Sequence, residues 1–139
     1  MAIKAQDFMS EHVVTIHEDM LMSQVAHLML REQVSAFPVV GTDNALVGII
    51  TLTDLFDVIN LAVTAHGHDL KEYLSSFKNV RVVEVMSKEV FSISPETRLT
   101  QIIRLLRERH IHTFPVMADG KLVGIVSRHD ILNAVFSFF

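Results

Sequence analysis

Apolar residues recur along this chain at two spacings, one typical of strands and one typical of helices. The two spacings alternate in the same order in both halves. In the first half, a β-branched run over 13–16 precedes a segment over 20–33 whose apolar residues recur at helical spacing. Strand-like runs over 37–40 and 45–51 then flank a turn, and a second helix is expected to start near Thr53-Asp54. The pattern predicts the order β-α-β-β-α.

The second half repeats this order of elements. A β-prone run over 90–93 precedes a helical spacing that begins at Leu99. A hairpin over 114–127 closes through Asp119-Gly120, a dipeptide typical of tight hairpin turns. A final helix is expected to start near His129-Asp130. The two halves therefore predict the same folding unit.

Matching residues also relate the two halves. Three short motifs recur in the same order: Met9-Ser10 as Met86-Ser87, Phe37-Pro38-Val39 as Phe114-Pro115-Val116, and Gly48–Asp54 as Gly124–Asp130. Their spacing is constant up to the hairpin turn, where the first copy is slightly longer. Because length changes are tolerated in turns, this alignment is physically reasonable. An internal repeat of this kind indicates two copies of one supersecondary unit.

The repeat divides the chain into a first copy over 1–60, a connector over 61–79 and a second copy over 80–139. The connector includes Ala65-His66-Gly67-His68, which interrupts the helical spacing, and then a predicted short helix from Leu70 to Phe77. A copy of about sixty residues buries too little apolar surface to be stable alone. We therefore expect an α+β fold in which two repeats pack sheet to sheet about a pseudo-twofold axis.

Composition narrows the class of protein. The chain has 139 residues, of which 50% are hydrophobic and 20% are charged, so we expect a substantial core rather than disorder. A net charge of −4, without a long basic run, argues against a nucleic-acid partner. The chain has no cysteine, no apolar run as long as a membrane helix and no signal-peptide pattern, so we expect a cytoplasmic protein without a membrane partner.

A hydroxyl and a carboxylate recur together in both copies, as Thr51 with Asp54 and Ser127 with Asp130. Each pair lies where a predicted strand passes into a helix. There the carboxylate can accept hydrogen bonds from ribose hydroxyls, and the hydroxyl can donate to a ribose or phosphate oxygen. The N-terminus of the following helix favours an anion. These residues predict two small-molecule sites.

The same motifs allow a purely structural interpretation. Aspartate is favoured near helix N-termini, so Asp54 and Asp130 can stabilise the helices without a ligand. The glycines that open the motifs, Gly48 and Gly124, can allow close approach to the backbone. Because hydroxyl, carboxylate and glycine recur together, we favour a binding site in at least one copy.

With these motifs, the chain resembles a tandem pair of CBS domains, the regulatory unit named after cystathionine β-synthase and also called a Bateman module. The resemblance covers nearly the whole chain except the connector and the last residues. It implies two units meeting through their sheets, with two ligand clefts. It also implies an adenosine-containing ligand such as AMP, ADP, ATP, S-adenosylmethionine or a dinucleotide. Members usually form homodimers, and they usually sense rather than catalyse.

The resemblance further implies which residues line each cleft. An adenine slot in the first copy would be formed by Val13, Val14, Thr15, Ala36, Phe37 and Pro38. The slot in the second copy would be formed by Val90, Phe91, Ser92, Thr113, Phe114 and Pro115. The position three before the proline, a frequent phosphate contact in the family, is Ser35 in the first copy and His112 in the second.

The two sites differ in charge. Between hydroxyl and aspartate, the first copy has Leu52-Thr53 and the second has Arg128-His129. With His112, the second copy offers a guanidinium and two imidazoles where the first offers none, so we expect it to bind a phosphorylated nucleotide more tightly. Ligand binding would change the geometry of repeats or subunits and signal to an unknown effector protein. The alternative is a structural dimerisation or protein-interaction module with degenerate sites.

The spacing of the eight histidines does not indicate a metal site, and the motifs in the sequence do not indicate an enzyme. His66 with His68 and His110 with His112 lack the complete spacing of a metal site. His66 and His68 are interpreted as solvated connector residues. No phosphate-binding glycine loop or nucleophile elbow is visible in the sequence. We therefore expect no metal and no catalytic residues.

Two further segments receive structural interpretations. One predicted helix carries three arginines, which we expect on a solvated face, with the alternative that one of them reaches a phosphate: Arg104, Arg107 and Arg109. The C-terminal segment is unusually apolar, and its phenylalanines would form an unfavourable exposed patch. We expect them to pack against the connector or a second subunit, and they are Phe136, Phe138 and Phe139.

Overall fold

The structure is a computed structural model that describes residues 2–66, 69, 71–72, 75 and 77–137. The chain forms two compact units. The central unit is one continuous stretch, Val14–Val90. The terminal unit combines Met1–Val13 with Phe91–Phe139. Parts of the predicted helix over 70–77 lie outside the described residues, as do His68, Phe138 and Phe139.

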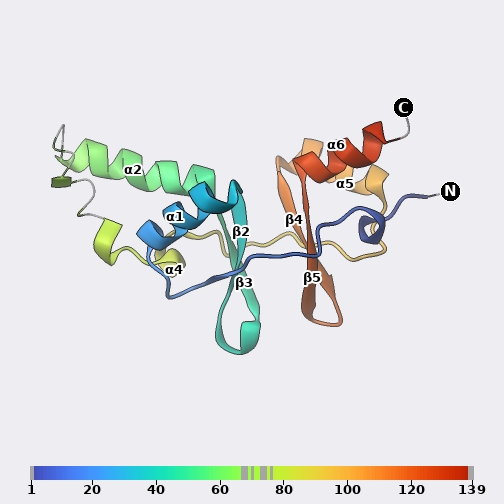
Figure 1. The fold of residues 1–139 in the computed structure, drawn as a ribbon, viewed down its shortest axis with the longest axis horizontal. Helices are drawn as coiled ribbons and strands as arrows, with labels where there is room; N and C mark the ends of the chain where they lie inside the picture. The colour runs from blue at the N-terminus through green and yellow to red at the C-terminus, as the bar shows by residue number, and fades with distance from the viewer. Residues whose placement is uncertain (1, 67–68, 70, 73–74, 76, 138–139) are drawn as a thin grey trace. The chain divides into compact units, whose positions relative to one another are not determined.

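The central unit combines a small mixed sheet with helices (Figure 1). Its elements are β1 (Ile16–His17), α1 (Met22–Glu32), β2 (Ala36–Val40), the short helix η2 (Thr42–Asn44), β3 (Leu46–Thr51), α2 (Leu52–His66), η3 (Phe77–Asn79) and α4 (Val82–Val85). The sheet order is β1-β2-β3, with β1 parallel and β3 antiparallel to β2. The first copy thus has the predicted order of elements.

The terminal unit repeats this arrangement. Its elements are η1 (Ala5–Asp7), α5 (Leu99–Arg109), β4 (Thr113–Ala118), β5 (Lys121–Ser127) and α6 (Arg128–Phe136). Strands β4 and β5 are antiparallel, and Ile93 bridges Val116 in the parallel sense, as β1 pairs with β2. The expected α+β fold of two repeats is confirmed, with α2 and α6 starting slightly earlier than predicted.

The first strand of each copy is shorter than predicted. Only Ile16 and His17 pair with β2, and only Ile93 bridges β4. The residues before them connect one unit to the other, because Ser10 bridges Ile125 in the terminal unit and the chain then enters the central unit. The apolar β-branched residues predicted as strands over 13–16 and 90–93 therefore lie largely in the chain connection between the units, and they pair only at their C-terminal ends.

Helices α1 and α5 begin and end in matching ways. The side-chain oxygens of Gln24 and Gln101 accept hydrogen bonds from backbone N–H groups at the helix starts, at 2.9 and 3.0 Å. Each helix ends at a residue in the left-handed conformation, Gln33 (φ 54°) and His110 (φ 55°), where the helical path cannot continue. No helix of the described residues has the length and apolar character needed to cross a membrane.

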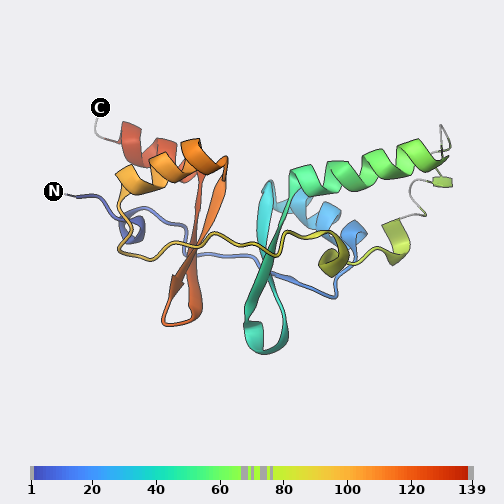
Figure 2. The same cartoon turned by 180° about the vertical axis from the view of Figure 1, so that it is seen from behind.

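The segments over 3–10 and 80–87 precede the first strand of each copy and are called lead-in segments here. Each lead-in segment joins the hairpin of the other copy. Ser87 exchanges two backbone hydrogen bonds with Ile49, both 3.0 Å, and Ser10 exchanges two with Ile125, both 2.9 Å. Figures 1 and 2 show the N-terminal segment passing beside β5. The repeats in the sequence and the compact units in space therefore do not share boundaries.

These lead-in segments explain the recurring glycines. A Cβ added to Gly48 would lie 2.6 Å from Met86 Sδ and 2.8 Å from the carbonyl oxygen of Ser87. A Cβ on Gly124 would lie 2.6 Å from Met9 Sδ and 3.1 Å from the oxygen of Ser10. The close approach expected at both glycines is thus made by the chain itself. The Met-Ser and glycine motifs recur together because they touch.

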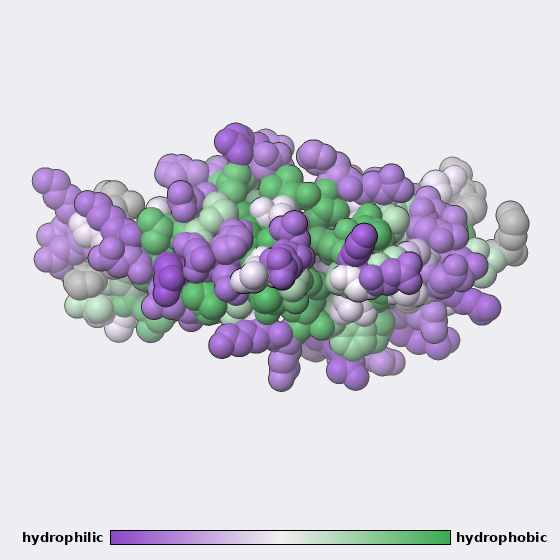
Figure 3. Space-filling model, turned by 90° about the horizontal axis from the view of Figure 1, so that it is seen from below, coloured by the Kyte–Doolittle hydropathy of each residue, from purple (hydrophilic) through white to green (hydrophobic). Residues whose placement is uncertain are grey.

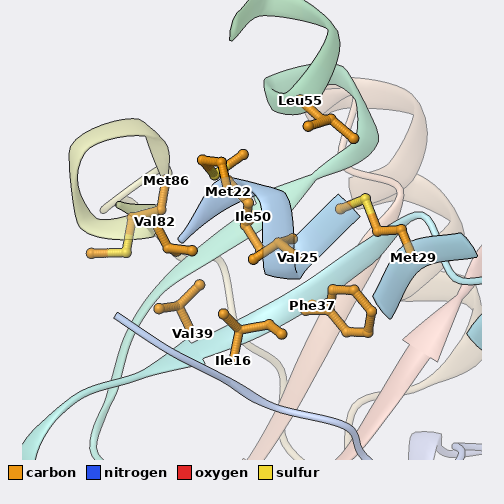
Figure 4. Close-up of a cluster of buried hydrophobic side chains, with 10 residues drawn as sticks. All are labelled: Ile16, Met22, Val25, Met29, Phe37, Val39, Ile50, Leu55, Val82 and Met86. Atoms are coloured by element: carbon orange, nitrogen blue, oxygen red, sulfur yellow. The ribbon is translucent and has the colours of Figure 1, made fainter. Parts of the chain in front are cut away.

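Each unit has its own hydrophobic core, and each core includes a lead-in segment of the other copy. The terminal core is built around Phe114 and contains Ala5, which is fully buried. The central core includes residues of β1 to β3, α1, α2 and α4 (Figure 4): Ile16, Met22, Val25, Met29, Phe37, Val39, Ile50, Leu55, Val82 and Met86. Neither copy completes its core from its own repeat alone.

Candidate functional site

In both units, the hydroxyl and the aspartate of the candidate site lie at the end of a hairpin. Ala36 pairs with Thr51 across β2 and β3, and Thr113 pairs with Ser127 across β4 and β5. Helices α2 and α6 follow these strands directly. This arrangement places a strand end and a helix N-terminus at the same point in each unit.

Each aspartate lies in the first turn of its helix and closes a reciprocal capping box. In the central unit, the Thr51 backbone N–H donates to Asp54 Oδ2 at 2.8 Å, and the Asp54 N–H donates to Thr51 Oγ1 at 3.2 Å. In the terminal unit, Ser127 N–H donates to Asp130 Oδ2 at 2.8 Å, and Asp130 N–H donates to Ser127 Oγ at 3.2 Å. Both aspartates therefore have a structural role.

The capping boxes leave part of each carboxylate available. Among the described residues, Oδ1 of Asp54 and Oδ1 of Asp130 accept no hydrogen bond. Both aspartates are partly exposed. A carboxylate has several acceptor positions, so it can cap a helix and also accept from a ligand hydroxyl.

The two hydroxyls are not equivalent. Ser127 Oγ donates to Asp130 Oδ2 at 2.9 Å, so its proton is already used within the capping box. Thr51 Oγ1 accepts from Asp54 N–H and makes no other hydrogen bond with the described residues. Sequence reasoning gave both hydroxyls the same donor role, whereas only Thr51 can donate to a ligand without breaking a bond in the structure.

Several residues assigned to the adenine slots have buried side chains. Phe37 is 1% exposed and Phe114 is 0% exposed, and both pack within the hydrophobic cores. Ala36, Pro38 and Pro115 are also buried. A fully buried side chain offers no surface to a ligand, so the side chains of Phe37 and Phe114 do not line an open slot in this structure.

The other slot residues retain solvent exposure. Thr15 and Ser92 are exposed, while the remaining members are partly exposed: Val13, Val14, Val90, Phe91 and Thr113. The boundary between the units falls within each trio, after Val13 in one and after Val90 in the other. Each trio thus lies on the connection between the two units.

The terminal unit carries the cationic groups that the sequence predicted for the second site. His112, Arg128 and His129 are all exposed. Partial burial of the imidazole lowers the pKa of His112 below its ordinary value, and the positive charges of Arg128 and His110 lower it further. His112, Arg128 and His110 are therefore close enough to interact electrostatically.

The matching positions of the central unit carry no such charge. They are Ser35, Leu52 and Thr53, all exposed, and the Leu52 N–H donates to the Ser35 carbonyl at 2.7 Å. This hydrogen bond holds the start of α2 beside the segment that follows α1. The two candidate sites thus share their carboxylate and differ in the charge around it.

Arg109 contacts Phe91, a residue assigned to the second adenine slot. Its guanidinium carbon lies 5.0 Å from the centroid of the Phe91 ring, within the range of a cation–π interaction. Arg109 is exposed, as expected of a solvated helix face, and the alternative that one of these arginines reaches a phosphate stays a prediction. Because Phe91 and Arg109 lie on different segments, no periodicity in the sequence could indicate this contact. Within the described residues, no cluster of three His, Asp or Glu side chains could hold a metal ion.

Solved structures with this fold include CBSX2 from Arabidopsis thaliana, which has a TM-score of 0.82 and 26% identity and covers 99% of this chain and 97% of that chain. A structure of CBSX2 in complex with AMP has a TM-score of 0.80 at 24% identity, covering 98% of both chains. The CBS domain pair of MJ0100, in complex with 5′-methylthioadenosine and S-adenosyl-L-methionine, has a TM-score of 0.80 at 20% identity and covers 100% of both chains. The last two likenesses establish the fold alone.

Sequence comparisons point to the same family. The CBS domain-containing protein YhcV of Bacillus subtilis is 32% identical over 91% of this chain and 81% of its own length. The homoserine O-acetyltransferase of Methanococcus vannielii is 26% identical over 94% of this chain, yet this chain spans only 24% of that enzyme. The family model described as CBS domain matches residues 5–61 and 82–137. The chain therefore belongs to the CBS domain family and contains two CBS domains in tandem.

Proposed function

We propose that this chain is a regulatory module that binds an adenosine-containing ligand, in the class of AMP, ADP, ATP or S-adenosylmethionine. The observation that carries the proposal is the available Oδ1 of Asp54 and Asp130, each beside a strand end and a helix N-terminus. Related CBS pairs have been solved with AMP and with S-adenosyl-L-methionine, which supports this ligand class. We propose no catalytic role.

In this proposal the aspartates recognise ribose. Oδ1 of Asp54 or Asp130 accepts from a ribose hydroxyl, and the exposed N-terminal turn of α2 or α6 faces the negative charge of a phosphate. A ligand changes the conformation only if it binds one arrangement of the module more tightly than another. The expected homodimer, the unknown effector protein and a cytoplasmic location are parts of this same proposal.

The second site is proposed to hold the more highly phosphorylated ligand. Arg128 and His112 lie at the hairpin end with Asp130, and a guanidinium matches the geometry of a phosphate. The first site offers Leu52 and Ser35 at the same positions. ATP is therefore expected to prefer the terminal unit, while an adenosyl ligand without phosphate is expected to show little preference.

A second candidate function has its own support. The capping boxes give Asp54 and Asp130 a structural role that needs no ligand. A structural dimerisation or interaction module with degenerate sites would retain these residues for helix stability. This alternative predicts that no adenosyl ligand raises the melting temperature.

Ligand-dependent melting separates the two candidates. A ligand that binds only the native state stabilises it by about 2.7 kcal/mol at a concentration of 100 times Kd. We expect AMP, ADP, ATP or S-adenosylmethionine to raise the melting temperature, and Asp130→Asn to reduce the rise for ATP. Asparagine keeps a side-chain oxygen for the capping box but loses the charge and one acceptor.

A matched control distinguishes ligand contact from helix capping. Gln101→Ala removes a capping acceptor of the terminal unit, 3.0 Å from Arg98 N, and is expected to lower stability without changing the shift caused by ligand. If none of the four ligands shifts the melting temperature at millimolar concentration, the regulatory proposal is wrong and the structural alternative stands.

A further inference from the structure

The terminal unit holds an arginine over the ring of Phe91. The guanidinium carbon of Arg109 lies 5.0 Å from the ring centroid. The arginine is exposed, and the ring is partly buried against the core of its own unit. Hydrophobic residues reach the surface among hydrophilic ones on the face drawn in Figure 3, so a partly exposed ring does not by itself indicate a site. The guanidinium held over the ring is the unusual feature.

Both residues lie at the same end of the unit as the second candidate site. Phe91 precedes Ile93 by two residues, and because Ile93 bridges β4 in the parallel sense, Phe91 lies toward the start of β4. Helix α5 ends at Arg109, and β4 begins four residues later at the residue that pairs with Ser127. A nucleoside whose ribose meets Asp130 therefore has this pair near the same strand end.

The guanidinium of Arg109 has unused binding capacity. Within the part of the chain that the structure describes, it makes no hydrogen bond and no ion pair. A guanidinium offers five N–H donors and a planar surface, and nucleic-acid bases stack on such planes. The contact with the Phe91 ring restricts the side chain before any ligand arrives, so less rotamer freedom is lost on binding than for an unrestrained arginine.

Arg109 lies apart from the charges expected to meet a phosphate. The positive charges that lower the pKa of His112 are those of Arg128 and His110, and Arg109 is not among them. Its partner is instead Phe91, the ring assigned by resemblance to the adenine slot. Arg109 is therefore placed for the base of a nucleotide rather than for its phosphates.

The described residues of the central unit hold no equivalent pair. Helices α1 and α5 end in matching ways, so Glu32 corresponds to Arg109, and the repeat aligns Val14 with Phe91. Glu32 Oε1 lies 3.6 Å from Arg31 Nε. A carboxylate and an aliphatic side chain provide neither a cation nor an aromatic face. The pair thus distinguishes the terminal unit from the central unit.

We propose that Arg109 contacts the base of the nucleoside bound in the terminal unit while its guanidinium stays on the Phe91 ring. This inference rests on the proposed function, because it names a further residue of the same site. Keeping the contact with the ring leaves the outer side of the guanidinium and its N–H groups for the base. Displacement of the arginine by the base would first give up the interaction with the ring. Base recognition therefore differs between the two units.

Titration with AMP, followed by nuclear magnetic resonance, tests this contact. The amide signals of Ser127 and Asp130 report on the terminal site. The amide signals of Thr51 and Asp54 report on the central site in the same titration. Arg109→Ala should weaken AMP binding about two- to fivefold at the terminal site, which is the effect of an exposed cation–π contact, and should leave the central site unchanged.

Arg107→Ala is the matched control for charge. It removes the same charge from the last turn of α5, and Arg107 contacts no aromatic ring of the described residues. This variant should leave the affinity of the terminal site for AMP unchanged. In the native complex, a nuclear Overhauser effect should connect the δ protons of Arg109 with H2 or H8 of adenine, and these protons should keep the ring-current shift caused by Phe91.

The outcomes separate this inference from the proposed function. Unchanged or tighter AMP binding at the terminal site of Arg109→Ala overturns the inference, as does an equal loss of affinity in Arg107→Ala. A bound AMP whose adenine shows no Overhauser effect to Arg109, or AMP that binds the central site only, also overturns it. Each of these results leaves the proposed function standing. If AMP binds neither site, the result contradicts the proposed function as well.

Discussion

The central and terminal units share a backbone plan but differ in what they present at the end of their hairpins. Both place an aspartate in the first turn of a helix and hold it in a capping box. Around that box, the central unit has Ser35 and Leu52, whereas the terminal unit has His112 and Arg128. The shared aspartates combine the capping role with the acceptor that we propose for ribose, and the residues that differ between the units set the charge around it.

The largest expected effect tests a contact that both units share, between a lead-in segment and the glycine of a hairpin. Gly48→Ala and Gly124→Ala should destabilise the protein by about 1–3 kcal/mol, because an added methyl overpacks the lead-in segment against the hairpin. Gly48→Ala should cost more, since its Cβ lies 2.8 Å from a backbone oxygen while that of Gly124 lies 3.1 Å from one. Chemical denaturation measures both changes.

A control variant makes this prediction specific. In Gly120→Ala, the added Cβ has no neighbouring atom within 4 Å. The φ of 75° at this position nevertheless favours glycine. Its cost should therefore come from backbone strain alone and be smaller, about 1 kcal/mol. Equal costs at Gly48 and Gly120 would contradict the contact with Met86 and Ser87.

The next effect tests the charge difference between the units. Arg128→Leu, which gives the terminal unit the residue of the central unit, should weaken ATP binding about tenfold or more, because a charge-assisted hydrogen bond contributes about 1.5–3 kcal/mol. Adenosine binding should change little. Isothermal titration of both ligands measures the difference, and the reciprocal Leu52→Arg variant should strengthen ATP binding at the central unit. Loss of adenosine binding in Arg128→Leu would contradict this role.

The smallest effect concerns pH. The pKa of His112 is lowered in the folded protein, so the unfolded chain binds more protons as the pH falls through about 6.5. Stability is therefore lost on acidification through this range, and the loss levels off below the folded pKa. The His112→Ser variant carries at this position the residue type of the central unit, Ser35. Its melting temperature should fall less between pH 7.5 and 5.5 than that of the native chain. An equal fall in both proteins would contradict the assignment.

Sequence reasoning predicted the features that local patterns encode. Helical spacing located α1 and α5, and Asp119-Gly120 located the turn between β4 and β5. The repeated motif placed Thr51 with Asp54 at the start of a helix, which the structure bears out as a capping box. These contacts lie within a few residues of one another, so spacing and residue type are enough to indicate them.

Contacts between distant segments could not be predicted in the same way. Nothing in the spacing of Gly124 shows that Met9 lies against it, although the recurrence of both motifs was a signal that they are related. Phe37 and Phe114 were assigned to ligand slots by resemblance, whereas burial on both faces of their strands places them in the cores. Which face of a short central strand meets solvent depends on packing that the sequence does not encode locally.

The crossed lead-in segments have a consequence for synthesis on the ribosome. Residues 1–13 are synthesised before the central unit, yet the hairpin that Ser10 joins, through Ile125, is synthesised after it. The central unit is one continuous stretch and can close its core while the chain is still growing. Until β5 has been synthesised, the segment over 1–13 keeps Ala5 and Met9 without their partners. A ribosome that stalls before β5 would release a chain with one finished unit and one exposed apolar segment, which is a substrate for chaperones and proteases.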